Sequence, residues 1–258
     1  MNHHRLAAVA LLASLALAAS GCAVIQRMVL FHPTHDAHAV ELQPWVDHGK
    51  VIGYARDMPE PRNVWLVLHG NGGQAATRDY VLKVFDDNDA VFVMEYPGYG
   101  ARAGTPSRTS IDRAARQAYR LLRARFPDRP VCVASESLGS GPAAVLSGEA
   151  DPPDKIVLVV PFSDLASLAG EYVKFPPPAW LVSGGWNNVK ALAGYRGPVE
   201  VFGAEFDQAI PVAQARELAA SLPQAQFHLL PGGHRDWSHA PDMRIRGPDV
   251  RDARSARR

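Results

Sequence analysis

Short apolar runs recur along the chain between segments that carry turn residues or helical periodicity. The run VWLVL at 64–68 has no alternation of polar and apolar positions, as is typical of a strand buried on both faces of a parallel sheet. The repeated order of such runs and helical segments predicts an α/β fold, with a mostly parallel sheet covered by helices on both faces. Further strands are expected within 24–56, at 91–94, from Val131, at 156–160, from Val199 and at 226–230.

Helices are expected between these runs, at roughly 75–85, 110–126 and 141–146. In the second of them, Ser110 is the expected N-cap and Pro127 ends the segment. The apolar residues of 110–126 recur at helical spacing and would bury one face. Arginines line the opposite face, which we interpret as solvated rather than as a contact with anionic lipid. These arginines are Arg113, Arg116, Arg120 and Arg123.

The chain has 258 residues, of which 47% are apolar and 21% charged, the composition of an ordinary globular protein. One α/β domain is expected at this length. The net charge of +1 gives no reason to expect nucleic acid as a partner.

The N-terminal residues have the pattern of a secretory signal, with a short basic start and an apolar run at 6–19 that is too short to span a bilayer. The run ends in ASGC at 19–22, which resembles a bacterial lipobox. The resemblance implies a signal peptide at 1–21 and a mature lipoprotein that begins at a lipidated Cys22, with palmitate among its acyl chains. Ala23 then favours the outer membrane, facing the periplasm. The alternative is an ordinary cleaved signal with a free Cys22.

Cys132 is the other cysteine of the chain and lies in a predicted strand. If Cys22 carries lipid, no disulfide can form within the chain, although the compartment is oxidising. We interpret Cys132 as a small buried apolar residue.

Small residues surround Ser137 in the segment VCVASESLGSGP at 131–142. A strand that turns sharply into a helix needs small residues two places before and two places after a nucleophile at the apex, and Ser135 and Gly139 occupy those places. The segment is therefore similar to the nucleophile elbow of α/β-hydrolases, with Ser135 in place of the usual first glycine. Taken alone, it is also compatible with a Ser/Gly-rich loop after a strand.

A second loop, HGNGG at 69–73, directly follows the strand at 64–68. Its glycines allow backbone N–H groups to point into a site. In α/β-hydrolases such a loop supplies one oxyanion-hole donor, and the residue after the nucleophile supplies the other. We therefore assign these roles to the backbone N–H groups of Asn71 and Leu138. His69 stands too early in the chain to be the base of this fold and is interpreted as structural.

Several motifs in this order resemble those of the BEM46-like serine hydrolases, a family placed beside the serine aminopeptidase-like group. They are HGNGG at 69–73, EYPGYG at 95–100, GTPS at 104–107 and SESLG at 135–139. The resemblance covers roughly 64–236. It implies an α/β-hydrolase domain at 22–236.

The order of catalytic residues in this fold is Ser, then Asp or Glu, then His. Asp207 lies in a loop after the strand from Val199, and His234 lies in a loop after the last strand. We predict a triad of Ser137, Asp207 and His234 that needs no metal or organic cofactor. Glu205 and Asp164 are the alternative acids, and His228 and His239 are interpreted as structural.

A metal site at His32, His35 and His38 is disfavoured. A metal needs ligands that converge, and this stretch contains Pro33 and has no helical apolar stripe.

Aromatic residues collect between Asp164 and Gly197, where α/β-hydrolases place a lid or cap. One interpretation is that they line an acyl pocket, and the other is that they belong to the core of a short helix. The residues concerned are Tyr172, Phe175, Trp180 and Trp186.

After His234 the sequence has too few apolar residues for the C-terminal helix that is usual in the family. We therefore expect a disordered tail at 237–258.

These features together predict a lipid-anchored serine hydrolase that cleaves carboxylic esters or thioesters. A peptidase of the same fold is the first alternative. The second is a non-catalytic envelope protein that uses the fold as a binding module, which the ordered Ser137, Asp207 and His234 disfavour.

Overall fold

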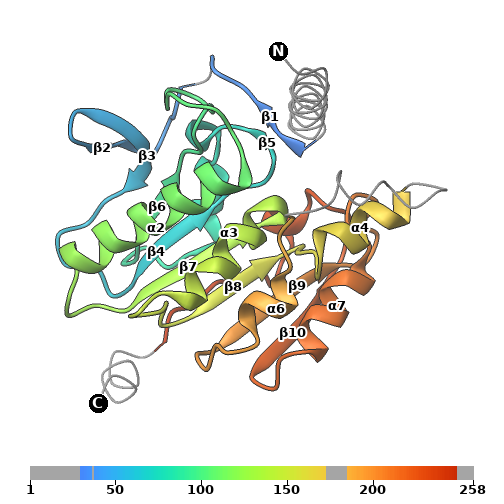
Figure 1. Cartoon of the computed structure of the whole chain (residues 1–258). Coiled ribbons are helices and arrows are strands. Elements are labelled where there is room, and N and C mark those ends of the chain that lie inside the picture. Colours follow the sequence, from blue (N-terminus) through green and yellow to red (C-terminus); the bar gives the residue numbers. More distant parts are fainter. Residues whose placement is uncertain (1–29, 37, 173–184, 249–258) are drawn as a thin grey trace, which may run out of the picture.

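The computed structural model describes residues 30–36, 38–172 and 185–248. An eight-stranded sheet runs through the centre in the order β10-β9-β8-β7-β4-β6-β3-β2 (Figure 1). Neighbours from β10 to β6 pair in parallel, and β3 and β2 add an antiparallel edge. The strands are β2 (Gln43–Asp47), β3 (Lys50–Arg56), β4 (Val64–Leu68), β6 (Ala90–Met94), β7 (Val131–Glu136), β8 (Ile156–Val159), β9 (Val199–Ala204) and β10 (Ala225–Leu230).

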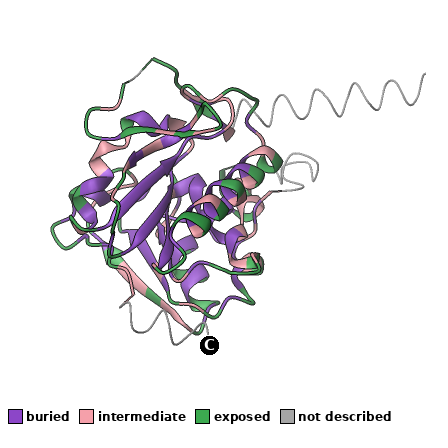
Figure 2. Cartoon of the chain, turned by 90° about the vertical axis from the view of Figure 1, so that its left-hand side faces the viewer, coloured by how far each residue is buried: buried purple, intermediate pink, exposed green. Residues whose placement is uncertain are grey.

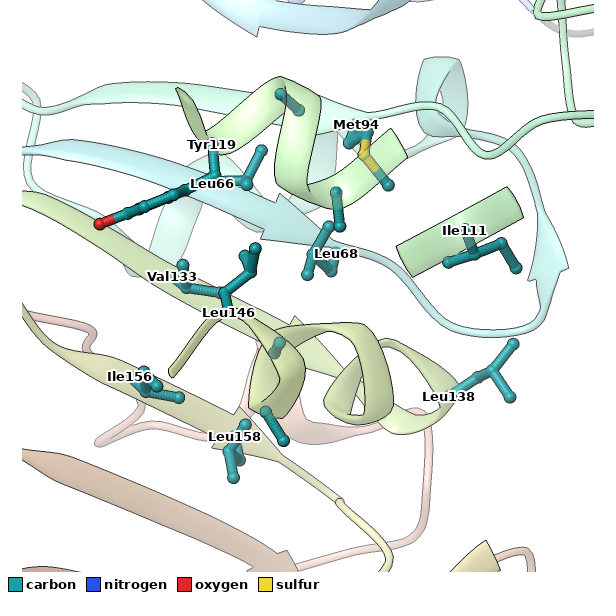
Figure 3. Packing of buried hydrophobic residues seen from close by; sticks show 14 of the residues in the cluster. Leu66, Leu68, Met94, Ile111, Tyr119, Val133, Leu138, Leu146, Ile156 and Leu158 are labelled. Atoms are coloured by element: carbon teal, nitrogen blue, oxygen red, sulfur yellow. The ribbon is translucent and has the colours of Figure 1, made fainter. Parts of the chain in front are cut away.

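The first face of the sheet packs against helices that supply small and branched residues. Leu66 and Leu68 of β4 point to this face, where they join Ile111 of α2 in one apolar cluster (Figure 3). Ala143 of α3 belongs to the same cluster. Side chains alternate along each strand, so every second strand residue enters this cluster. The helices of this layer are α2 (Arg108–Arg125), α3 (Ser140–Val145), α4 (Leu165–Tyr172), α6 (Asn188–Leu192) and α7 (Val212–Ala220).

The second face is covered by short 3-10 segments and by the C-terminal residues. Trp65 and Val67 of β4 lie in a second cluster with Val81. Figure 2 shows the strands at the centre of the sheet buried between the two layers. Every residue of β4 is buried, so its apolar pattern is explained by cover on both sides. The segments on this face are η1 (Ala75–Thr77), η2 (Asp79–Val84) and η5 (Trp237–His239).

The sequence predicted one helix at 75–85, and the structure has η1 and η2 there instead. The backbone N–H of Ala75 is bound by the buried carboxylate of Glu95, with distances of 3.0 and 3.1 Å to its two oxygens. Arg78 separates the two segments, and its guanidinium turns back to the carbonyl of Gly72. These tertiary contacts fix the backbone where helical propensity alone would favour a continuous helix.

The N-cap of helix α2 lies three residues before the predicted N-cap at Ser110. Ser107 is the N-cap, and its hydroxyl accepts from the N–H of Ser110 at 3.1 Å. The hydroxyl of Ser110 accepts in turn from the N–H of Ser107 at 2.9 Å. This reciprocal pair is a capping box, in which the third residue of the helix and the N-cap satisfy each other's backbone.

The described part of the expected disordered tail at 237–258 differs from that expectation, and residues 249–258 lie outside the described residues. Trp237, Met243 and Ile245 are buried in the second cluster, and the N–H of Ile245 donates to the carbonyl of Val84 at 2.8 Å. The segment therefore covers the sheet without forming a long helix. Its few apolar residues suffice because η2 already covers part of the same face.

Parallel strands place the loops after β4, β7, β9 and β10 at one edge of the sheet, because their carboxyl ends all point the same way. A small parallel pair, β1 (His32–Pro33) and β5 (Gly72–Gly73), lies beside this edge (Figure 1). The residues predicted to carry chemistry follow these four strands.

Candidate active site

Ser137 lies at the sharp turn between β7 and α3. Its φ of 54° falls in the left-handed region, which non-glycine residues rarely adopt and which a nucleophile elbow requires. The turn also needs Gly139, because a Cβ there would lie 2.0 Å from the carbonyl oxygen of Leu68. Ser135 is buried on β7, where its small side chain fits the predicted role.

His234 connects Ser137 to Asp207. Its Nε2 lies 2.9 Å from Oγ of Ser137, and its Nδ1 lies 2.7 Å from Oδ2 of Asp207. Since a carboxylate can only accept, Nδ1 carries the proton and Nε2 is free to accept from the serine hydroxyl. The structure thus brings together the three residues that the sequence placed in separate loops.

The Asp207 carboxylate is held from both sides. Its Oδ1 accepts from the N–H groups of Ala209 and Ile210, each at 2.8 Å, which leaves Oδ2 for His234. The side chain is 1% exposed. A buried carboxylate with several donors is fixed in direction, so it orients the imidazole.

The other titratable candidates lie elsewhere. Asp164 caps the start of α4, where its Oδ1 accepts from the N–H groups of Ala166 and Ser167, and Glu205 is exposed. His228 stacks on Phe202 with ring centroids 4.5 Å apart. His69 is buried beside Glu95, with 3.5 Å between Nε2 and Oε1. None of these four residues contacts the Ser137–His234 pair among the interactions of the described residues.

The loop at 69–73 is fixed from behind by two tyrosines. Tyr96 Oη donates to the carbonyl of His69 at 2.6 Å, and Tyr99 Oη donates to the carbonyl of Asn71 at 2.8 Å. Burial raises the pKa of both phenols, so they remain protonated donors. Tyr96 and Tyr99 of the motif EYPGYG thus hold the loop that carries Asn71.

Ser137 opens into a cavity of about 720 Å³ whose wall includes Asn71, Leu138 and His234. One part of the wall is apolar, made by Leu30, Phe162, Leu165, Leu168 and Ile210. Another part is polar, made by Arg78, Tyr80, Glu136, Arg235, Ser238 and His239. The two predicted oxyanion donors and the nucleophile therefore line the same cavity. A cavity of this size with apolar and polar walls is typical of a small-molecule site.

Comparison with solved structures gives the same arrangement of strands. Est1E from Butyrivibrio proteoclasticus superposes with a TM-score of 0.61 over 76% of this chain and 90% of that chain, at 14% identity. The structure of a predicted hydrolase from Thermoplasma acidophilum matches with a TM-score of 0.56 over 85% of this chain and 97% of that chain, at 16% identity. The chain has the α/β-hydrolase fold.

Curated proteins with related sequences include one that is named an alpha/beta hydrolase domain-containing protein, WAV2 of Arabidopsis thaliana. An uncharacterized protein of Mycobacterium tuberculosis is 28% identical over 176 residues, which are 66% of this chain and 62% of that protein. Lysophosphatidylserine lipase ABHD12 of Xenopus tropicalis is 27% identical over 245 residues, which are 83% of this chain and 62% of that protein. The matches thus span about three fifths of the length of these relatives. They are consistent with the resemblance to BEM46-like hydrolases, and no protein-family model matches the chain.

The aromatic residues that the sequence predicted to line an acyl pocket do not form the described wall of the cavity. Trp186 is buried against Gly141 of α3, and its Nε1 donates to Asp112 at 2.8 Å, so it belongs to the core. Tyr172 is exposed and donates to the carbonyls of Gln208 and Ala209. Phe175 and Trp180 lie outside the described residues. The apolar wall instead comes from α4 and from Leu30, Phe162 and Ile210.

A polar group on the cavity wall was missed by the sequence analysis. Arg78 and Tyr80 both reach Glu136, the residue between Ser135 and Ser137. The signal was available in part, because a carboxylate next to the nucleophile of a buried elbow needs a counter-charge. The sequence alone did not reveal which of the basic residues supplies it.

The described part of the chain contains no helix with both the length and the apolarity to span a bilayer. Cys22 and the signal segment lie outside the described residues. Cys132 is fully buried on β7, and burial raises the pKa of its thiol well above the ordinary value. Its interpretation as a small core residue matches this position.

Proposed function

We propose that the chain is a serine hydrolase that cleaves carboxylic esters or thioesters. The observation that carries the proposal is the continuous hydrogen-bonded series from Asp207 through His234 to Ser137, at the base of a cavity. A serine hydroxyl is a weak nucleophile at its ordinary pKa, and a base held by an acid activates it.

In the proposed mechanism, Ser137 Oγ attacks the carbonyl carbon while its proton passes to Nε2 of His234. The carbonyl oxygen becomes an oxyanion, which the N–H groups of Asn71 and Leu138 stabilise. Collapse expels the alcohol or thiol, which takes the proton from His234. Water then attacks the acyl-enzyme with His234 as base again, and the carboxylic acid leaves Ser137 free.

We infer that the substrate is lipid-like, with its acyl chain on the apolar wall. Leu165, Leu168 and Ile210 offer that wall, whereas the cavity-lining residues that follow His234 are polar. His234 must protonate the departing alcohol or thiol, so the leaving group belongs on its side of the cavity. The similarity to a lysophosphatidylserine lipase supports a lipid ester as substrate.

Replacing Leu165 by tryptophan tests the acyl wall. The larger ring would shorten the apolar part of the cavity, so kcat/KM for p-nitrophenyl octanoate should fall roughly 10-fold while the acetate changes less than about 3-fold. Val46→Trp is the matched control, because Val46 is 52% exposed on the edge strand β2. Equal losses for both esters would contradict the assignment of the wall. Turnover of an amide substrate in preference to every ester and thioester would favour a peptidase instead.

We also propose that the chain is lipid-anchored in the bacterial outer membrane through Cys22, facing the periplasm. The lipobox-like residues 19–22 support this assignment. In a bacterial host, the wild-type chain should fractionate with membranes and take up labelled palmitate, and Cys22→Ala should lose both properties. Retention of the label in Cys22→Ala would contradict it.

A further inference from the structure

A carboxylate lies beside the nucleophile of this hydrolase. Glu136 directly precedes Ser137, lines the same cavity, and has a side chain that is 12% exposed. A Cβ added to Gly70 would lie 3.6 Å from Oε1 of Glu136 and also 3.6 Å from Cβ of Ser137. Oε1 of Glu136 and Cβ of Ser137 therefore flank the same point and are separated by at most twice that distance. The carboxylate is therefore close to the place where Ser137 would form a tetrahedral intermediate.

A negative charge at that place opposes the proposed reaction. The intermediate carries an oxyanion, and two like charges near each other in a partly buried site repel. The carbonyl oxygen gains negative charge in the transition state but not in the bound ester. An uncompensated Glu136 would therefore raise the energy of the transition state more than that of the bound ester. The site thus needs a compensating positive charge for Glu136.

Arg78 supplies this charge from the other side of the carboxylate. Its Nη1 lies 3.5 Å from Oε2 of Glu136 and donates to Tyr80 Oη at 2.8 Å, and Tyr80 Oη donates to the same Oε2 at 2.9 Å. Burial lowers the pKa of Arg78, but Glu136 together with Tyr80 and Tyr96 outweighs this effect and raises the pKa, so the guanidinium stays charged. Burial and Glu136 raise the pKa of Tyr80, which keeps its hydroxyl a donor.

The same guanidinium also holds the loop that carries Asn71. Nη2 of Arg78 donates to the carbonyl of Gly72, the residue after Asn71. Arg78 thereby joins the two chain segments that carry the proposed oxyanion donors, the loop at 69–73 and the elbow at Glu136 and Ser137. A planar guanidinium can serve both, because its donors point in fixed, different directions.

We propose that Arg78 is a positioning residue for the hydrolysis, which neutralises Glu136 beside the oxyanion and fixes the Asn71 loop against the elbow. This inference rests on the proposed function, since it concerns the transition state of that reaction. It assigns Arg78 a role other than binding the substrate.

The test is a double-mutant cycle on the purified full-length chain in detergent, with p-nitrophenyl butyrate as substrate. Arg78→Gln should lower kcat about 30-fold with little change in KM, because it leaves a carboxylate unpaired at the oxyanion. Glu136→Gln should stay within about 3-fold of the wild type, because it removes the repulsive charge. The double variant should recover at least about 5-fold relative to Arg78→Gln, which a purely structural role would not produce.

Arg123→Gln is the matched control, since Arg123 is 9% exposed and pairs with Asp154 at 2.6 Å on the α2 side of the molecule. It should reproduce any general loss of stability from breaking a buried pair, with kcat unchanged. Circular dichroism melting curves of all variants establish that each is folded. If Arg78→Gln does not fold, the kcat of Glu136→Gln alone tests the proposal. A loss of more than about 10-fold in the kcat of Glu136→Gln then overturns it.

Other outcomes have distinct meanings. A rise in KM with kcat unchanged in Arg78→Gln, or no recovery in the double variant, overturns the role of Arg78 and favours a contact with substrate. Absence of turnover by the folded wild type contradicts the proposed function itself. Failure of the role proposed for Arg78 can therefore be distinguished from failure of the proposed hydrolase function.

Discussion

Replacing His234 by alanine should lower kcat for ester hydrolysis by about 10⁵-fold, and Ser137→Ala should lower it about as much. Without the imidazole, nothing removes the proton from Oγ of Ser137 or returns it to the leaving group. Without the hydroxyl, no acyl-enzyme forms. Residues that act as one unit give losses that do not add, so the double variant should be no slower than either single variant. Initial rates with p-nitrophenyl butyrate provide the measurement.

His228→Ala is the matched control for the loss of a histidine. His228 lies on β10 and stacks on Phe202, away from the cavity. Its replacement should change stability modestly and leave kcat within about 2-fold, as expected for a residue outside the site. Equal activity of His234→Ala and wild type would exclude His234 as the base.

Replacing Gly139 by alanine should destabilise the folded chain by about 3 kcal/mol. The added Cβ would meet the carbonyl oxygen of Leu68 at 2.0 Å and its carbon at 2.6 Å. Both belong to backbone that is fully buried in the sheet, so neither can move without shifting β4. Such a shift also displaces the loop at 69–73, and activity should fall together with stability. Urea denaturation followed by tryptophan fluorescence gives the change in midpoint.

Gly148→Ala is the control for that experiment. A Cβ at Gly148 would meet nothing within 4 Å, so its replacement should change stability by less than about 1 kcal/mol. A midpoint for Gly139→Ala as high as that of Gly148→Ala would show that the elbow does not pack closely against β4.

The sheet and the three residues at its edge were predictable because local patterns determine them. Runs without polar residues, such as 64–68, are compatible with few structures other than a strand covered on both faces. The chain order of Ser137, Asp207 and His234 then followed from the order of the strands that carry them. The structure places these side chains within hydrogen-bonding distance of one another, although each stands in a different loop.

The parts that were not predicted depend on contacts distant in sequence. Trp186 is an aromatic residue in the segment where a cap was expected, but its burial depends on the space above Gly141, which no local pattern encodes. The burial of Ile245 depends similarly on the cover that η2 leaves open. The pairing of Arg78 with Glu136 needs the spatial adjacency of β4 and β7, whose loops are far apart along the chain.

The central claim is that Ser137 is a nucleophile activated by His234, and covalent labelling tests it most directly. The purified full-length chain is treated with a fluorophosphonate probe, and the modified peptide is located by mass spectrometry. We expect rapid modification of Ser137 in the wild type, none in Ser137→Ala, and labelling slower by several orders of magnitude in His234→Ala. A folded wild-type chain that remains unlabelled, or that is labelled at another residue, would contradict the account.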